Sequence, residues 1–324
     1  MRNFYRLAAS SACLSMLTYL IIGVTVFLAV WSLVILLRGV RKPFRFSWHR
    51  IFFSASLATL MYLYGAWVYL SIHCKFIFGI IYLLTLVYSL MRKRPIRRRH
   101  DKWRIKLNIG FGILFSILCV LYFTGTTGFT ERIALAFPLK TGKYFVLQGG
   151  KGLPANMFHY SYRGAVYAID IVKLNEYGNR ANSIFSKNLE DYEIYGDTIF
   201  SPCAGKVIGV KNDNFDNPPG IRKRGPTNLN AVIVETDSCY VFLGHNKKGS
   251  AMVKEGDVVT LGQPLALVGN SGFSLEPHLH IQVHKKSGTG LPWYREPQLF
   301  IEFDGRAYLL FEVIRPKRIR MVEK

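Results

Sequence analysis

Long apolar runs dominate the first third of the chain. Cys13–Leu37 contains 25 residues without a charge, enough to cross ~30 Å of hydrocarbon at 1.5 Å per residue. Ile51–Met91 runs for 41 residues with Lys75 as its only fixed charge, and one helix of that length would be roughly twice as long as the bilayer core is thick. We therefore place a turn at residues 73–75 and predict about four transmembrane helices: Cys13–Leu37, Ile51–Ser71, Phe76–Met91 and Leu107–Phe123.

The pattern changes from about Ile133 onwards, where short alternating runs are separated by turn residues. This spacing predicts an all-β, mainly antiparallel domain that resembles a barrel or a sandwich. We expect a membrane region at 1–125, a linker at 126–142, a β domain at 143–304 and a basic extension at 305–324. The predicted strands are Lys143–Leu147, Val166–Val172, Lys206–Val210, Ala231–Glu235, Tyr240–Leu243, His278–Val283 and Ala307–Val313. The long irregular stretch Lys211–Asn228 is either a wall of a binding cleft or surface decoration.

The net charge of +22 is distributed unevenly along the chain. Residues 1–110 contain 17 Lys and Arg but a single acidic residue, Asp101, so most of the charge lies beside the apolar runs. This distribution indicates membrane topology and argues against a nucleic-acid partner. The loops Arg38–Arg50 and Arg92–Lys106 contain five and nine basic residues, which places them in the cytoplasm. The protein is then a multi-pass membrane protein whose β domain is extracytoplasmic.

Cysteines contribute little to the prediction. Cys203 and Cys239 are the only pair in the β domain, and their spacing does not show whether they form a disulfide. No C-x-x-C sequence is present, which argues against a zinc site built from thiolates. The oligomeric state is likewise not readable from the sequence.

Three histidines gather near the end of the predicted β domain. In the strand that begins at His278, His278 and His280 project from the same face, and their Cα atoms lie roughly 7 Å apart. That separation suits one imidazole that ligates a metal and a second that reaches a water molecule at the metal. Two histidines that merely alternate on a half-polar strand are the plain alternative. His245 ends an apolar strand just upstream, in a region where neighbouring strands usually pair.

Two further residues complete a set of candidate metal ligands. Asp170 interrupts an otherwise apolar strand, and a carboxylate is costly to bury there unless it is paired or ligates a metal. A hydrogen bond from Asp170 to a loop amide is the alternative. His159 is the only histidine between the last apolar run and Asp170. Neutral imidazoles with one carboxylate, and a position left open for water, form a hydrolytic zinc set.

These motifs together resemble the lysostaphin-type zinc endopeptidases, which cut the peptides of bacterial peptidoglycan. The resemblance covers roughly Tyr144–His284 and rests on an early His and Asp, a middle His, and G-N-S-G followed by P-H-L-H at residues 269–272 and 277–280. It implies one Zn²⁺ per chain, with Asp170 and His280 as ligands and with His245 and His278 as catalytic residues that do not bind the metal. The family's common H-x-x-x-D pattern is absent, since His159 precedes Asp170 by eleven residues, and we assign His159 as the third ligand.

We therefore expect a membrane-anchored zinc metalloendopeptidase that hydrolyses peptidoglycan peptides. In this mechanism His278 accepts a proton from the attacking water, while His245 stabilises the oxyanion or shares the role of base. His284 is expected to be a surface residue or a residue that supports the ligands. Three alternatives stay open: a metal-free binding module on the same fold, a zinc peptidase that acts on another peptide, and a phosphohistidine carrier of the sugar phosphotransfer system. The carrier would need a cytoplasmic domain, which the basic loops oppose.

Overall fold

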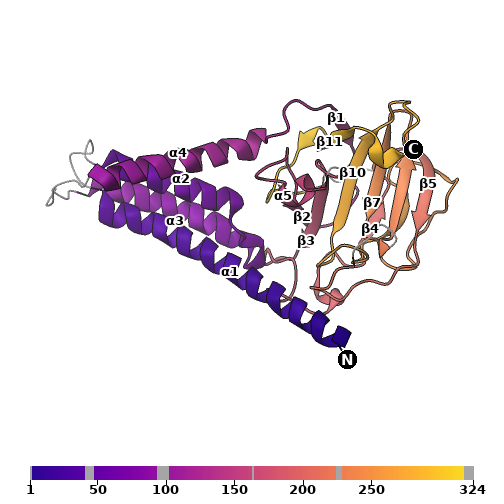
Figure 1. The fold of residues 1–324 in the computed structure, drawn as a ribbon, viewed down its shortest axis with the longest axis horizontal. Coiled ribbons are helices and arrows are strands. Elements are labelled where there is room, and N and C mark those ends of the chain that lie inside the picture. The colour runs from indigo at the N-terminus through magenta and orange to yellow at the C-terminus, as the bar shows by residue number, and fades with distance from the viewer. Residues whose placement is uncertain (1, 41–46, 93–101, 163, 224–227, 317–324) are drawn as a thin grey trace. The chain divides into compact units, whose positions relative to one another are not determined.

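The computed structural model describes residues 2–40, 47–92, 102–162, 164–223 and 228–316. Most of the two basic loops and the end of the basic extension (41–46, 93–101 and 317–324) lie outside the described residues. The chain divides into a helical unit, Met16–Thr124, and a second unit that joins Gly125–Lys324 with Met1–Ser15. Figure 1 shows the helices and the strands of the two units.

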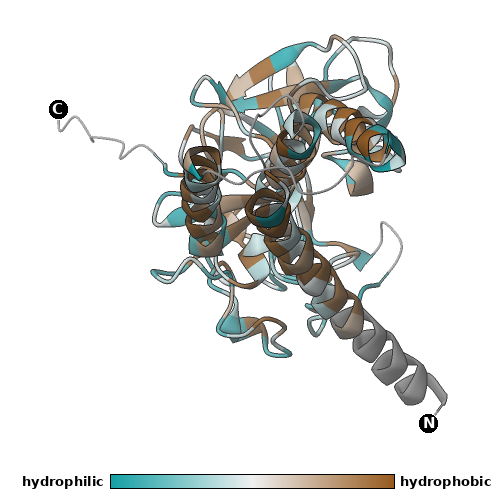
Figure 2. Ribbon diagram, turned by 90° about the vertical axis from the view of Figure 1, so that its left-hand side faces the viewer, coloured by the Kyte–Doolittle hydropathy of each residue, from teal (hydrophilic) through white to brown (hydrophobic). Residues whose placement is uncertain are grey.

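The described residues contain four long helices, and three of these include a stretch long and apolar enough to cross a membrane by length and composition. The helices are α1 (Arg2–Gly39), α2 (Trp48–Tyr64), α3 (Ile72–Met91) and α4 (Lys102–Thr124). The candidate spans are Met16–Gly39, Ile72–Met91 and Lys102–Thr124, and the long helices in Figure 2 are mostly brown, the colour of hydrophobic residues. The prediction of four spans is therefore wrong, since α2 has 17 residues and at 1.5 Å per residue is only about 26 Å long.

The break between α2 and α3 also lies earlier than predicted. Gly65 ends α2, and a Cβ atom there would lie 2.4 Å from both the Met61 carbonyl oxygen and the Trp67 Nε1. Because glycine leaves this space open, Trp67 donates a hydrogen bond from Nε1 to the Met61 carbonyl at 2.8 Å, and the chain turns there. Ser71 then caps α3, so Lys75 lies inside the helix with its Nζ 4.8 Å from the centre of the Tyr62 ring.

The second unit is built on one long, mainly antiparallel sheet, as predicted. Its path is β13-β2-β3-β10-β7-β6-β5-β8, and β1, β11 and β12 branch from it through β10; β1 and β11 are parallel. The path has two ends in the described residues, so the barrel is not closed. A separate pair, β4-β9, completes the unit. The strands are β1 (Arg132–Leu135), β2 (Lys143–Gln148), β3 (Ile169–Leu174), β4 (Thr198–Phe200), β5 (Gly205–Lys211), β6 (Ala231–Glu235), β7 (Cys239–Gly244), β8 (Val258–Val259), β9 (Pro264–Leu267), β10 (Leu279–Lys285), β11 (Gln298–Phe303), β12 (Arg306–Ala307) and β13 (Val313–Ile314).

Six of the seven predicted strands correspond to β2, β3, β5, β6, β7 and β10, with shifted ends in all but β6. The strand predicted at Ala307–Val313 is wrong, because Phe311 has φ +60° and the chain between β12 and β13 is not extended. The structure places β1 in the predicted linker and pairs it with β11, while β12 and β13 lie in the predicted extension. Cys203 and Cys239 are both free thiols.

The strand β10 lies in the middle of the sheet and packs one face against the hydrophobic core. Leu279, Ile281 and Val283 have at most 1% of their surface exposed and belong to the hydrophobic core of this unit. This is the apolar alternation that the sequence shows. It leaves His280, Gln282 and His284 on the opposite face, where the candidate site is assembled.

Candidate metal centre

The sheet order brings the candidate residues together around His280. The strand β10 lies between β3 and β7, and in the register of the two ladders His280 is opposite Asp170 on one side and Gly244 on the other. His245 follows Gly244 directly. A Cβ on Gly244 would lie 2.7 Å from the Phe242 ring, which would have to shift, but at an ordinary contact distance of 3.7 Å from the Cδ2 of His280.

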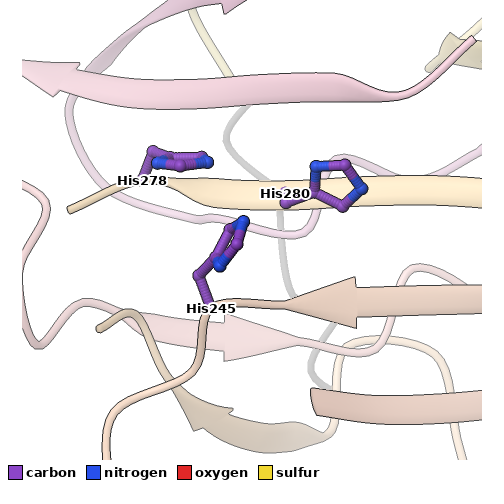
Figure 3. A group of neighbouring side chains, drawn as sticks. All are labelled: His245, His278 and His280. Atoms are coloured by element: carbon purple, nitrogen blue, oxygen red, sulfur yellow. The ribbon is translucent and has the colours of Figure 1, made fainter. Parts of the chain in front are cut away.

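All five residues that the sequence singled out meet in one place. His245, His278 and His280 form one group of close ligand atoms, and His159, Asp170 and His280 form a second; within each group the atoms lie within 4.8 Å of one another. Each of the five residues is less than 10% exposed. Figure 3 shows His278 and His280 along β10 and its leading segment, with His245 reaching toward them from the end of β7.

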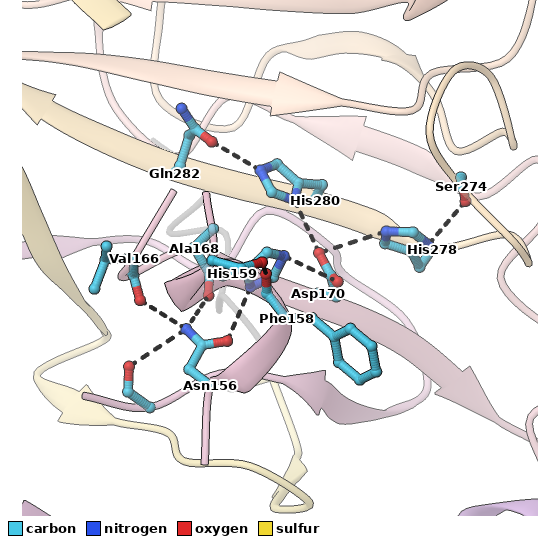
Figure 4. Close-up of polar contacts among 12 residues, drawn as sticks. Asn156, Phe158, His159, Val166, Ala168, Asp170, Ser274, His278, His280 and Gln282 are labelled. Atoms are coloured by element: carbon cyan, nitrogen blue, oxygen red, sulfur yellow. Dashed lines mark hydrogen bonds and ion pairs between the residues drawn. The ribbon is translucent and has the colours of Figure 1, made fainter. Parts of the chain in front are cut away.

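His159 reaches this group through a short helix and a buried amide. The helix α5 (Met157–Tyr160) carries His159, and its Nε2 lies 3.2 Å from the Oδ2 of Asp170. Asn156 directs the ring, because its Nδ2 lies within 3.4 Å of the carbonyl oxygens of Gly150, Val166 and Ala168, as Figure 4 shows. The Oδ1 of Asn156 must then accept from the Nδ1–H of His159 at 2.9 Å, which leaves the Nε2 lone pair pointing at Asp170.

A second hydrogen-bond chain fixes the proton on His280. The Nδ1 of His284 donates to the Glu296 carbonyl at 2.8 Å, so its Nε2 accepts from the Nε2 amide of Gln282 at 2.9 Å. The same amide donates to the Gly164 carbonyl, and the Oε1 of Gln282 therefore accepts from the Nε2–H of His280 at 2.9 Å. His280 is left with a lone pair on Nδ1, which lies 2.9 Å from the Oδ1 of Asp170.

These two chains leave a lone pair of His159 and a lone pair of His280 facing the Asp170 carboxylate. With both rings neutral, no proton lies between the Asp170 carboxylate and the lone pairs of His159 Nε2 and His280 Nδ1, and the three residues could hold a metal ion. Ligand atoms about 2.0–2.2 Å from a tetrahedral Zn²⁺ are separated by about 3.3 Å. The nitrogens lie at comparable distances from the carboxylate, 3.2 Å from Oδ2 for His159 and 2.9 Å from Oδ1 for His280. Two imidazoles and a carboxylate are ligands that suit this ion. All three residues are buried, and an outer hydrogen bond supports each imidazole.

The other two histidines also present a defined nitrogen to the centre. The Nδ1 of His278 donates to the Glu276 carbonyl at 2.8 Å, and its Nε2 lies 3.4 Å from the Oδ1 of Asp170. The Nδ1 of His245 donates to the Ser271 carbonyl at 2.7 Å. His245 adopts φ +65°, a left-handed conformation that is uncommon for a residue with a Cβ. The two rings lie 4.6 Å apart, and each has its Nε2 free to accept a proton.

Burial and the neighbouring charges separate the titration of these groups. Burial raises the pKa of a carboxyl, but His159 and His278 act against it and hold the pKa of Asp170 well below its usual value. Burial, with His278 and His280 nearby, lowers the pKa of His245 well below that of an ordinary imidazole. For His278 burial acts in the same direction, but the Asp170 carboxylate outweighs it and raises the pKa. Asp170 is therefore an anion and His245 a neutral base.

Sequence reasoning missed the residues that hold the ligands in place. Asn156 and Gln282 had no assigned role, and the carbonyls of Ser271 and Glu276 could not be read from side-chain identities. The alternation of β10 was the only usable signal, since it places Gln282 and His284 on the face of His280. Of the two alternatives expected for His284, the structure matches the supporting residue and not the surface residue, because His284 is fully buried and is hydrogen-bonded to Gln282.

Comparison with known proteins supports a peptidase domain. Residues 190–291 match the model of peptidase family M23. A search of curated proteins finds no match. Similar solved structures include the catalytic domain of a variant of EnpA, a prophage-encoded M23 protein from Enterococcus faecalis. The match has 19% identity, covers 50% of this chain and 93% of that chain, and has a TM-score of 0.30.

Two other similar structures are a zinc-containing peptidase from Vibrio cholerae and the catalytic domain of the antimicrobial peptidase lysostaphin from Staphylococcus simulans. The first has 18% identity, covers 52% of this chain and 40% of that chain, and has a TM-score of 0.28. The second has 20% identity, covers 45% of this chain and 80% of that chain, and has a TM-score of 0.25.

Proposed function

We propose that the protein is a membrane-anchored zinc endopeptidase that hydrolyses peptide bonds of peptidoglycan outside the cytoplasmic membrane. The observation that carries this proposal is the set of acceptor atoms on His159, Asp170 and His280, which face one another across 2.9–3.2 Å. The match of residues 190–291 to peptidase family M23 supports a peptidase. The resemblance of the G-N-S-G and P-H-L-H motifs to the lysostaphin type supports cell-wall peptides as substrates.

In this proposal His159 Nε2, an Asp170 oxygen and His280 Nδ1 hold the metal. When bound, Zn²⁺ supplies a Lewis acid that polarises the scissile carbonyl and makes water more acidic. His278 Nε2 accepts the proton of the attacking water and returns it to the leaving amine. His245 Nε2, which is neutral because burial lowers the pKa of this ring, shares the role of base. The Nδ1–H bonds of both rings to backbone carbonyls keep each Nε2 directed at the reaction.

Defined muropeptides test the reaction. The full chain, purified in detergent and loaded with one equivalent of Zn²⁺, should convert a cross-linked muropeptide into two products whose summed mass exceeds that of the substrate by one water. A chelator-treated sample and the His278→Ala variant are the controls, and both should leave the substrate intact. Cleavage of an unrelated peptide but of no muropeptide would favour the zinc peptidase of another substrate. Intact substrates with full zinc would favour a binding module.

The extracytoplasmic location rests on the nine basic residues of Arg92–Lys106, which directly precede and begin the candidate span Lys102–Thr124. A reporter that is active only in the cytoplasm should work when it is fused after Arg99 and should fail when it is fused after Gly128. The opposite pattern would place the second unit, here called the β unit, in the cytoplasm and would favour the function of a phosphohistidine carrier.

A further inference from the structure

An exposed arginine lies on an aromatic ring beside the candidate site. The guanidinium carbon of Arg222 is 4.4 Å from the centre of the Phe273 ring, and Tyr162 contacts the same ring at 5.9 Å between centroids. Arg222 and Tyr162 are exposed, and Phe273 is half-buried. No ion pair among the described residues includes Arg222. We call these three residues the arginine rim.

Two of the three residues of the arginine rim, Tyr162 and Phe273, come from segments that also carry the site. Tyr162 lies three residues after the ligand His159. Phe273 lies two residues after Ser271, whose carbonyl accepts the hydrogen bond of His245 at 2.7 Å. The contact between Tyr162 and Phe273 therefore joins the segment that carries His159 to the segment whose Ser271 carbonyl holds the ring of His245.

The backbone holds the Arg222 segment against the loop that leads to His278. The amide of Lys223 donates to the Gly272 carbonyl at 3.0 Å, and the amide of Gly220 donates to the Leu275 carbonyl at 2.7 Å. The buried amide of Asn217 donates from Nδ2 to the same Gly272 carbonyl. These hydrogen bonds thus hold the segment that carries Arg222, and the contact with the Phe273 ring further limits the conformations of its side chain.

The carboxylates near the rim already have other partners. Asp216 accepts from the amide of Asn270 at 2.7 Å and from the hydroxyl of Tyr195 at 3.1 Å. Glu276 is paired with Arg180 at 2.7 Å. The positive charge of Arg222 is therefore available to a ligand. A guanidinium that lies on a ring keeps its N–H donors in its own plane, where a carboxylate can accept two of them.

We propose that Arg222 is a specificity residue that binds a carboxylate of the substrate peptide near the scissile bond. This inference rests on the proposed peptidase function and gives it a direction: the enzyme prefers a wall peptide with a free carboxylate to the same peptide with a carboxamide. Phe273 and Tyr162 form the apolar wall against which the adjoining part of the peptide packs.

The test compares two cross-linked peptides that differ only in carboxylate or carboxamide at one position beside the scissile bond. The zinc-loaded full chain in detergent should cleave the carboxylate form with a kcat/KM about 10- to 100-fold higher, the range of one charge-assisted hydrogen bond. Arg222→Gln should remove this preference by slowing the carboxylate form alone. Lys223→Gln is the matched control, because it removes the same charge at the next residue and should keep the preference.

Equal losses in Arg222→Gln and Lys223→Gln would overturn the proposal in favour of a diffuse basic surface, as would equal rates of the two peptides in the unmodified chain. A second measurement distinguishes failure of this proposal from failure of the peptidase function. Both peptides are titrated into the zinc-loaded His278→Ala variant, and their binding is measured by calorimetry. Tighter binding of the carboxylate form that Arg222→Gln abolishes would support the site even without hydrolysis. Equal binding of both forms, or no binding of either, would refute it.

Discussion

Gln282 offers the sharpest test of how the candidate metal centre is held. Its Oε1 accepts from the Nε2–H of His280 at 2.9 Å, and its amide nitrogen donates to Gly164 and His284. Gln282→Leu keeps most of the side-chain volume but removes the acceptor. The Nε2–H of His280 then has no fixed partner, and the ring is free to change its tautomer or turn its Nδ1 away from Asp170.

The expected size follows from the hydrogen bond that is lost. Leaving one buried donor without its partner costs about 1–3 kcal/mol, and each 1.4 kcal/mol is a factor of ten in affinity. Removal of a group that supports a metal-bound histidine typically costs 10- to 100-fold in metal affinity. We therefore expect Gln282→Leu to weaken zinc binding by about 10- to 100-fold.

A substitution that strengthens the acceptor at this position should not weaken zinc binding. Gln282→Glu keeps an oxygen beside the Nε2–H of His280 and gives it a negative charge, which makes Nδ1 a stronger donor to a metal. It loses the hydrogen bonds to Gly164 and His284, at a cost in stability of about 1–3 kcal/mol. Zinc affinity should be equal to or higher than that of the unmodified chain, although the thermal stability falls.

Zinc affinity is measured by competition with a chromophoric chelator at one pH, on the full chain in detergent, with circular dichroism to show that each variant is folded. A folded Gln282→Leu variant with unchanged zinc affinity would refute the reasoning. It would mean either that His280 presents Nε2 to the metal or that the metal lies elsewhere.

Three further predictions test other parts of the site. His280→Ala and Asp170→Ala should lose zinc and activity together. His278→Ala should keep near-normal zinc while its cleavage rate falls ~10²–10⁴-fold. A zinc-free His278→Ala variant would show that His278, not His280, is the metal ligand. Arg180→Met should lower the free energy of unfolding of the β unit by about 3–5 kcal/mol in denaturant titrations, since it leaves the buried Glu276 charge unpaired, and Glu276→Gln in the same chain should restore part of the loss. Zinc at 100 times its Kd should stabilise the β unit by about 2.7 kcal/mol over the chelated protein, and an unchanged melting temperature would exclude a folded-state site.

The sequence was sufficient for the parts of the fold that depend on local pattern. Strict alternation predicted β10 to within two residues at each end and placed His280 on the face opposite Leu279 and Ile281. It failed where one residue overrides the pattern. Phe311 adopts a left-handed conformation inside an apolar run, and Gly65 ends α2 inside a run that reads as continuous helix. Neither event changes the hydrophobic period on which the prediction rested.

The candidate ligands were recognisable, but their geometry was not. Asp170 was recognisable because a carboxylate in an apolar strand needs a partner. The residue types and their order also suggested His159, although eleven positions separate it from Asp170. That Asp170 lies opposite His280 depends on the pairing of β3 with β10, 110 residues apart. Such a register is decided by the packing of the whole sheet and cannot be read from either strand alone.

The match to peptidase family M23 begins at residue 190, after His159 and Asp170, so two of the three proposed ligands lie outside it. Their assignment therefore depends on the physics of the site. Asn156 is committed to three carbonyls and can offer His159 only an acceptor, and Gln282 is committed to Gly164 and His284 and can offer His280 only an acceptor. Each supporting amide thereby places a proton on the outer nitrogen and a lone pair on the inner one. Two separate parts of the chain impose the same condition around one carboxylate, and a divalent cation satisfies both.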